Sequence, residues 1–236
     1  QDFQQYAEEA AYQLMNYVWG KRHEFHYTGL TREPQEALQA ALDFSGKPVF
    51  LTDSGDNVTS GATGWNTGIL RQVLQTETTK KFLFATICDP AAYQTLSACK
   101  TGEELSFTLG VGFDELSSAV ELDAVVKSSG KLTGFMMHDH TSVFGHCVNV
   151  HVKGTSIDIM VADTGWAVCE LHQFVSVGID VDAYDVIVVK QGYIFPDFKA
   201  KGKLCVMSLT EGATLQDTAR LPFKRIMRPM FPIDDI

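Results

Sequence analysis

The sequence predicts an α/β protein with a mixed β-sheet flanked by helices. Three observations support this class. Apolar strand-like segments alternate with helical segments between residues 47 and 99, strand-like segments fill residues 104–171, and the alternation returns after residue 184. Hydrophobic residues make up 45% of the 236 residues and charged residues 20%, so the chain can bury a substantial core.

A helical lead-in, residues 1–46, is expected to come first. Apolar side chains recur at helical spacing from Ala7 to Trp19, and Pro34 is typical of the start of a second helix. The chain opens with Gln1 inside the first expected helix. We therefore expect this segment to link a missing N-terminal domain to the main α/β domain, residues 47–236.

The main domain should have parallel strands at both ends and a strand-rich antiparallel section in the middle. Strands are expected at residues 47–52, 81–88, 184–191 and 203–209, and helices at 66–75, 90–99 and from Pro196. The antiparallel strands should lie within residues 104–113, 122–137, 142–163 and 166–171, with a hairpin turn near Lys153 and Gly154. Three prolines in the last 16 residues exclude a long terminal helix.

The composition disfavours several classes of partner. The formal net charge is −10, and an acidic surface repels the phosphates of nucleic acids. No apolar run reaches the roughly 20 residues of a membrane-spanning helix, and no cluster of Lys and Arg predicts binding to a membrane surface. The five cysteines are scattered, without the spacing of a zinc site or redox pair. We expect free thiols and a cytoplasmic, reducing location.

A loop rich in acids and glycines, LTDSGDNVTSGATG, follows the first buried strand. Its carboxylates could bind a metal, move a proton or accept from an amine, and its glycines would let backbone amides approach a ligand. Such loops lie at the carboxyl ends of strands, where open α/β sheets bind ligands. The candidate binding residues are Asp53, Asp56, Asn57, Gly61, Gly64 and Asn66. The alternative is a turn-rich loop whose polar side chains satisfy their own backbone.

Histidines offer a second, less favoured candidate site. His138 and His140 would share one face of a strand, and with a third imidazole from a neighbouring strand they could hold zinc; His146 and His151 lie in the same segment. The alternative is a set of strand histidines that face solvent and do not converge.

Two further candidate binding residues are Lys190, near the end of an expected strand, and Arg228, which lies among prolines. Lys190 ends an apolar strand close to Tyr193 and could bind a carboxylate or another anion; alternatively, its ammonium reaches water. Arg228 lies between prolines and could clamp a carboxylate of a substrate or of the protein itself.

Three ordered segments resemble the C-terminal portion of the microcystinase C (MlrC-like) metallopeptidase family. They are PVFLTDSGDNVTSGATGWNTGILRQVL, FVSVGIDVDAYDVIVVKQGYIFPDFKAKGK and LPFKRIMRPMFPIDD. The resemblance runs from about residue 47 to the end and is weakest between residues 100 and 170.

The resemblance implies a zinc-dependent hydrolase of small peptides or amides, built from two domains. The metal ligands would lie in the N-terminal domain, so no metal ligand is expected in this chain. The acid- and glycine-rich loop would face the cleft between the domains, together with Lys190, Tyr193 and Arg228. One departure concerns Trp65, because relatives commonly carry an acid there. An indole can neither ligate a metal nor take a proton, which puts the substrate and part of the loop's role in question.

We therefore expect the C-terminal domain of a zinc metallopeptidase that is inactive without its own N-terminal domain and that could form a homo-oligomer. The alternative is a non-catalytic α/β domain in which the same loop binds a small ligand.

Overall fold

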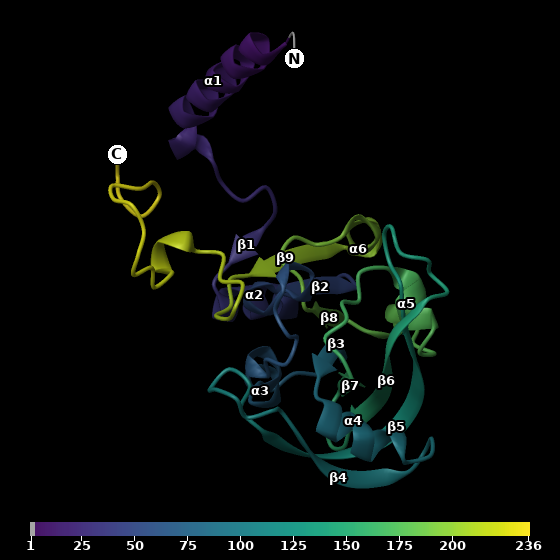
Figure 1. The fold of residues 1–236 in the computed structure, drawn as a ribbon. Coiled ribbons are helices and arrows are strands. Elements are labelled where there is room, and N and C mark those ends of the chain that lie inside the picture. Colours follow the sequence, from purple (N-terminus) through teal and green to yellow (C-terminus); the bar gives the residue numbers. More distant parts are fainter. Residues whose placement is uncertain (1–2) are drawn as a thin grey trace.

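The computed structural model describes residues 3–236 and confirms the α/β class. Nine strands of this part of the chain form one sheet in the order β1-β9-β2-β8-β3-β7-β6-β5-β4. Figure 1 shows this sheet running through the body, with helices around it.

The element bounds agree with most of the predicted strands and helices, although β1 and α5 were not predicted. The strands are β1 (Thr31–Arg32), β2 (Val49–Asp53), β3 (Phe82–Cys88), β4 (Glu104–Leu109), β5 (Val120–Thr133), β6 (Val143–Val152), β7 (Ile157–Ala162), β8 (Val186–Val189) and β9 (Leu204–Ser208). The α-helices are α1 (Gln4–Gly20), α2 (Pro34–Asp43), α3 (Gly68–Leu74), α4 (Pro90–Ser97), α5 (Leu171–Val175) and α6 (Pro196–Lys201).

The sheet has a parallel half and an antiparallel half, as predicted. Neighbouring strands from β1 to β7 in the sheet order run parallel, and β7, β6, β5 and β4 pair antiparallel. Every residue of β2, β3 and β8 is buried, which is typical of parallel strands covered on both faces. The predicted hairpin joins β6 to β7, and Gly154 in its turn has a φ of 75°.

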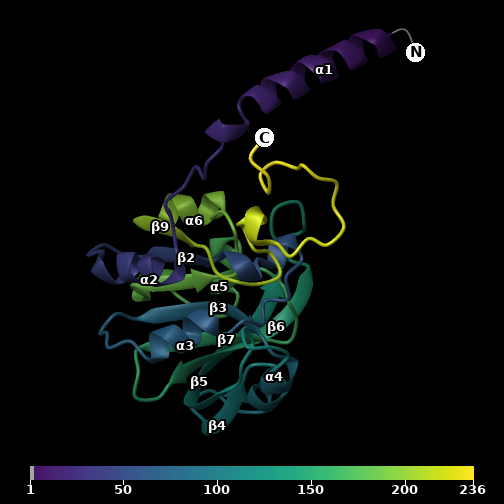
Figure 2. The ribbon, with the colours of Figure 1, turned by 90° about the vertical axis from the view of Figure 1, so that its left-hand side faces the viewer.

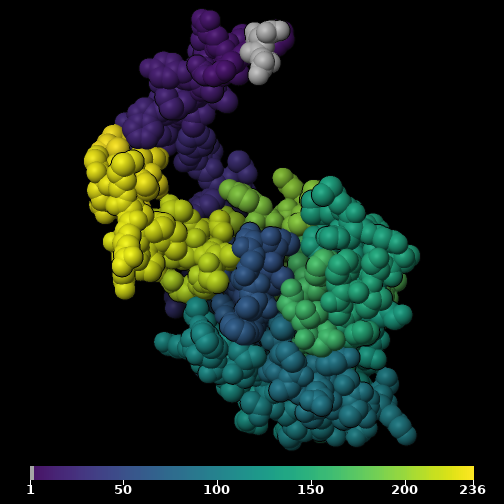
Figure 3. Space-filling view, in the orientation of Figure 1, coloured from purple at the N-terminus to yellow at the C-terminus, as the bar shows by residue number. Residues whose placement is uncertain are grey.

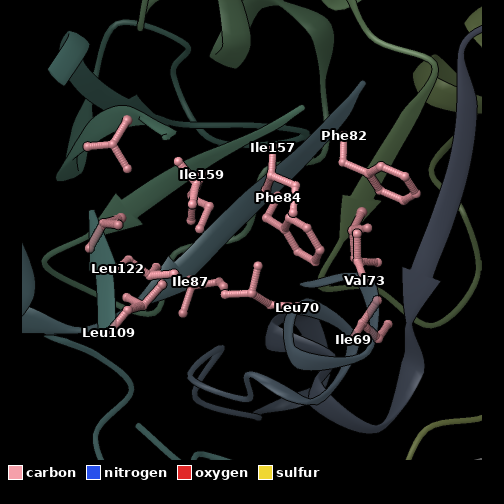
Figure 4. Packing of buried hydrophobic residues seen from close by; sticks show 14 of the residues in the cluster. Ile69, Leu70, Val73, Phe82, Phe84, Ile87, Leu109, Leu122, Ile157 and Ile159 are labelled. Atoms are coloured by element: carbon pink, nitrogen blue, oxygen red, sulfur yellow. The ribbon is translucent and has the colours of Figure 1, made fainter. Parts of the chain in front are cut away.

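Two apolar cores lie on opposite faces of the sheet, because successive side chains of a strand point to opposite sides. In β2, Val49 belongs to the core covered by α2, α3 and α4, and Phe50 belongs to the core covered by α5 and α6. Figure 4 shows the first core, where Leu70 of α3 faces Phe84 and Ile87 of β3. The two cores fix the sheet between helical layers and thereby set where its strand ends lie.

One predicted strand, at residues 166–171, is wrong. These residues run as irregular chain into α5, which the sequence reading missed. Glu170 and Gln173 cap the first turn of α5 reciprocally, in the arrangement of a capping box. A helix of five residues is too short to show a helical period, so the cap was its only sequence signal.

The expected placement of His138 and His140 on one face of a strand is also wrong. β5 ends at Thr133, and both histidines lie in the turn-rich loop that leads to β6. The Asp139 carboxylate accepts from the backbone N–H and the hydroxyl of Thr141, 2.9 Å away in each case. This local turn competes with extended pairing.

The two helices of the lead-in differ in their contacts. α2 buries Ala37, Leu38 and Ala41 against the sheet, whereas α1 buries none of its residues. Figures 2 and 3 show α1 projecting away from the body, near the C-terminal segment. The rings of Trp19 and Phe231 meet edge to face with centroids 6.4 Å apart.

Among the helices described in residues 3–236, none has the length and apolar character needed to cross a bilayer.

Candidate functional site

The acid- and glycine-rich loop lies at the carboxyl ends of three neighbouring parallel strands, β2, β8 and β9. Asp53 is the last residue of β2, Lys190 follows β8 directly, and Thr210 lies two residues beyond β9. Because the strands run parallel and adjacent, their ends bring these side chains together although they are far apart in sequence.

A buried ion-pair network joins Lys190 to the loop. Its Nζ lies 2.8 Å from Asp53 Oδ2 and 2.9 Å from Asp56 Oδ2, and it donates to Asn66 O at 2.5 Å. Lys190 is only 5% exposed, and each aspartate is 2% exposed. The alternative that the Lys190 ammonium reaches water is therefore wrong.

The network is electrostatically stable despite its burial. Burial lowers the pKa of Lys190, but the Asp53 and Asp56 carboxylates raise it by more, so the net shift is upward and the lysine is charged at neutral pH. A buried charge of this kind tolerates its loss of hydration only with close counter-charges and hydrogen bonds.

Backbone and hydroxyl donors satisfy the remaining carboxylate oxygens. Asp56 Oδ1 accepts from Gly64 N at 2.9 Å, and Asp56 Oδ2 accepts from Asn66 N at 2.8 Å. Asp53 Oδ1 accepts from Thr210 Oγ1 at 2.5 Å. Asp56 therefore closes the loop onto the start of α3, and Asp53 ties it to the segment after β9.

The segment after β9 also binds the loop, although no pattern in the sequence indicates it. Gly55 N donates to Thr210 Oγ1 at 2.8 Å, and Asn57 N donates to Thr214 Oγ1 at 2.9 Å. A Cβ on Gly55 would lie 2.3 Å from the carbonyl oxygen of Glu211, so this glycine lets two backbones cross. Isolated threonines in a loop carry no pattern that sequence reading can detect.

An open cavity of about 400 Å³ lies against β2, β9 and α6, and no residue of the Lys190 network lines it. Thr52, the neighbour of Asp53, lines it together with Tyr193, Lys199 and Cys205. The Thr52 hydroxyl is buried and has no hydrogen-bond partner among the described residues. Tyr193 is 52% exposed, so its hydroxyl is available to a ligand.

The other predicted site residues take separate places. Asn57 accepts from Thr59 N at 3.1 Å and so caps a short turn, in which Gly61 has a φ of 98°. Trp65 packs on Phe113 with ring centroids 5.5 Å apart. The contact of Asn57 lies within the loop, whereas that of Trp65 joins the loop to the segment between β4 and β5.

Arg228 lies apart from the network, in the exposed C-terminal segment. Its guanidinium pairs with the Asp234 carboxylate, six residues away. This arrangement agrees with the interpretation in which Arg228 clamps a carboxylate of the protein itself.

The loop carboxylates do not fit a metal ion, which was one of the roles that their chemistry allowed. The Lys190 ammonium occupies the position between Asp53 and Asp56 where a cation would bind, and every oxygen of both carboxylates already accepts from a donor. Within residues 3–236, the one group whose donor atoms converge as metal ligands is His140, Glu170 and His172. His138 is not part of it, because its ring packs on Phe144 and Trp166.

Comparison with solved structures shows the same fold in a larger protein. A crystal structure of a proposed metallopeptidase from Mesorhizobium sp. BNC1 superposes with a TM-score of 0.74 and 20% identity, over 95% of this chain and 45% of that chain. This chain therefore spans less than half the length of that protein. No curated protein matches the chain.

The family model described as MlrC C-terminus matches residues 51–225. This range begins in β2 and includes the loop, Lys190, Tyr193 and the threonines after β9. The match covers most of the chain and confirms the resemblance seen in the sequence, so the chain belongs to the MlrC C-terminus family.

Proposed function

We propose that this chain is the C-terminal domain of a zinc-dependent hydrolase of small peptides or amides, and that its loop lines a cleft shared with an N-terminal domain. The observation that carries the proposal is the buried Lys190 network, which fixes an acid- and glycine-rich loop at the carboxyl ends of β2, β8 and β9. Support also comes from the similar fold of the proposed metallopeptidase from Mesorhizobium.

In this proposal the loop positions the substrate and does not perform the proton transfers. All carboxylate oxygens of Asp53 and Asp56 already accept from Lys190 or from other donors of the chain, so the role of these residues is to hold the loop at the strand ends. The groups left for a substrate are the half-exposed Tyr193, the partly exposed indole of Trp65 and the open backbone around Gly61. A zinc ion held by the other domain would polarise the scissile carbonyl and activate water.

The contact with an N-terminal domain is proposed from the unpartnered face of α1. An apolar depression of about 810 Å³ is lined by Leu14, Met15, Trp19, Phe25 and Phe231. Exposed apolar patches of this kind usually mark a surface that another protein or domain covers. The larger size of the Mesorhizobium protein is consistent with such a domain.

Hydrolysis assays on short peptides, with the metal content measured, test the proposal. The chain alone should be inactive, and the protein with its N-terminal domain should be active and contain zinc. In the active protein Tyr193→Phe should lower turnover, whereas Tyr93→Phe on α4 should not, because Tyr93 does not line the cavity that Tyr193 lines. Full activity of the chain alone would overturn the two-domain proposal.

The second candidate is a non-catalytic domain that binds a small anionic or hydroxylated ligand. The cavity against β2, β9 and α6 favours it, since Lys199, Tyr193 and Thr52, whose buried hydroxyl has no partner among the described residues, all line it. A two-domain protein that binds short peptides tightly but never cleaves them, with or without zinc, would support this candidate against the hydrolase.

A further inference from the structure

Three side chains with metal-binding atoms meet on the surface at the start of α5. His140 lies in the loop between β5 and β6, Glu170 precedes α5, and His172 lies in its first turn. Figure 1 shows α5 beside β5 and β6, which is how the loop and the helix come together. The ligand atoms of the three residues all lie within 4.8 Å of one another.

The distances around Glu170 agree with those of a metal site. Glu170 Oε2 lies 3.1 Å from His140 Nε2 and 3.3 Å from His172 Nδ1. In a tetrahedral zinc site with bonds of about 2.0–2.1 Å, neighbouring ligand atoms are about 3.3 Å apart. The two imidazoles stack with centroids 4.2 Å apart, so both present nitrogen edges toward the same carboxylate oxygen.

The hydrogen bonds of His172 fix which of its nitrogens is free. Its Nε2 lies 3.0 Å from Gly134 O, and since a carbonyl oxygen can only accept, Nε2 carries the hydrogen. In neutral His172 the other nitrogen, Nδ1, therefore has a lone pair, and it faces the Glu170 carboxylate, which is also an acceptor. Two acceptors at 3.3 Å repel each other unless a cation lies between them.

The surroundings orient the ligands as they do in known metal sites. Histidine ligands commonly donate their second ring N–H to a backbone carbonyl, as His172 does to Gly134. Glu170 is held on its other oxygen, because Oε1 accepts from Met136 N at 3.0 Å. The loop itself is closed by the bond from Gly134 N to Ser142 O at 3.0 Å.

We propose that His140, Glu170 and His172 form a binding site for a divalent cation of the zinc class. Two imidazole nitrogens and one carboxylate oxygen suit Zn²⁺, Co²⁺ or Ni²⁺ better than Mg²⁺ or Ca²⁺, which prefer oxygen ligands. The side chains are 53%, 20% and 33% exposed in that order, which leaves room for water as a fourth ligand and lets the His140 ring tilt toward the ion. The bound ion would join the loop after β5 to α5.

Zinc titration of this chain, purified without a histidine tag, tests the site. Calorimetry with Zn²⁺ alone should show one equivalent bound per chain, and Co²⁺ should give the visible absorption of a tetrahedral complex. His140→Ala and His172→Ala should each weaken Zn²⁺ binding at least about 10-fold, which is the effect already seen when only a supporting residue of a metal site is lost. Acidification should release the ion, because an imidazolium cannot be a ligand.

His146→Ala is the matched control. His146 forms a half-exposed pair with Asp163, 3.3 Å apart, but no second histidine joins it in the described residues. Its removal should leave Zn²⁺ binding unchanged. Glu170→Gln provides an independent variant should His172→Ala fail to fold, because glutamine keeps an acceptor for the cap while removing the charge.

The proposal would be overturned if the chain did not bind Zn²⁺ stoichiometrically. It would also be overturned if the wild type, His140→Ala and Glu170→Gln bound Zn²⁺ with equal affinity. In either case a proton would be the cation of this cluster. The readout is binding alone, so it is independent of whether the chain belongs to a peptidase.

Discussion

Replacing Lys190 with Met should destabilise the chain strongly, because it strands two carboxylates in the interior. Lys190 Nζ lies 2.8 Å from Asp53 Oδ2 and 2.9 Å from Asp56 Oδ2. With an effective dielectric constant of about 20, each contact supplies about 6 kcal/mol of attraction, most of which only offsets the loss of hydration. Removing one partner of such a buried pair typically costs about 3–5 kcal/mol of unfolding free energy.

Urea unfolding followed by tryptophan fluorescence measures this loss. For a chain of 236 residues, about 3–5 kcal/mol corresponds to a fall in melting temperature of roughly 6–20 °C. The control is Lys153→Met, which removes an exposed pair with Glu104 and should change the midpoint little. Adding Asp53→Asn to Lys190→Met should recover part of the loss, because one stranded charge is neutralised.

The pH dependence gives a separate check. The pKa of Lys190 is raised above 10.5, so its stabilisation is complete below that pH and is lost only as the pH rises through the higher folded value. Wild-type stability should therefore hold through moderately alkaline pH. A Lys190→Met variant as stable as the wild type at neutral pH would refute the reasoning, since it would mean that the two buried carboxylates do not need a counter-charge.

Three further predictions follow from the fold. Gly55→Ala should lower the unfolding midpoint, because its Cβ would lie 2.3 Å from a backbone oxygen, whereas Gly68→Ala, with open space around it, should not. Burial raises the pKa of Asp158, but hydrogen bonds lower it by more, so the net shift is downward. Ionised Asp158 therefore stabilises the fold above about pH 3.8, and this stabilisation is lost as the pH falls through the lower folded pKa. Asp158→Asn should weaken this loss of stability at acid pH, measured by urea unfolding at a series of pH values. A thiol reagent should modify native Cys99 well before Cys147, whose burial raises its pKa to about 12; equal rates by mass spectrometry would contradict the packing.

Local patterns were sufficient for most of the fold. Strands such as Phe82–Cys88 are continuous apolar runs between helices, and this hydrophobic pattern predicts parallel strands buried on both faces. The five-residue helix at Leu171–Val175 escaped notice because it is shorter than two helical turns. The strand expected at residues 166–171 failed for a related reason, since an apolar run fits either buried chain or strand.

The position of the acid- and glycine-rich loop was predictable from the sequence, but its bonding was not. A loop with Asp53 and Asp56 after a buried strand points to the carboxyl edge of the sheet, and the structure places it there. The sequence could not show that Lys190, 137 residues after Asp53, would neutralise that loop, because such pairing depends on which strands are neighbours. Likewise, Glu170 and His172 were overlooked because nothing in their spacing indicates that His140 comes to them.

Donor and acceptor balance separates the two charged clusters of this chain better than residue type does. In the Lys190 network every carboxylate oxygen meets a donor, so the cluster is complete without a ligand and acts as a scaffold. At neutral His172 a lone pair and a carboxylate face each other, and a cation between them, either a metal ion or a proton, relieves that mismatch. The acids and glycines of the sequence indicate the Lys190 network as a candidate site, yet only the cluster of His140, Glu170 and His172 contains an acceptor that lacks a donor. Incomplete bonding is therefore the stronger physical argument for a binding site, and it favours the cluster at α5 over the loop at Asp53.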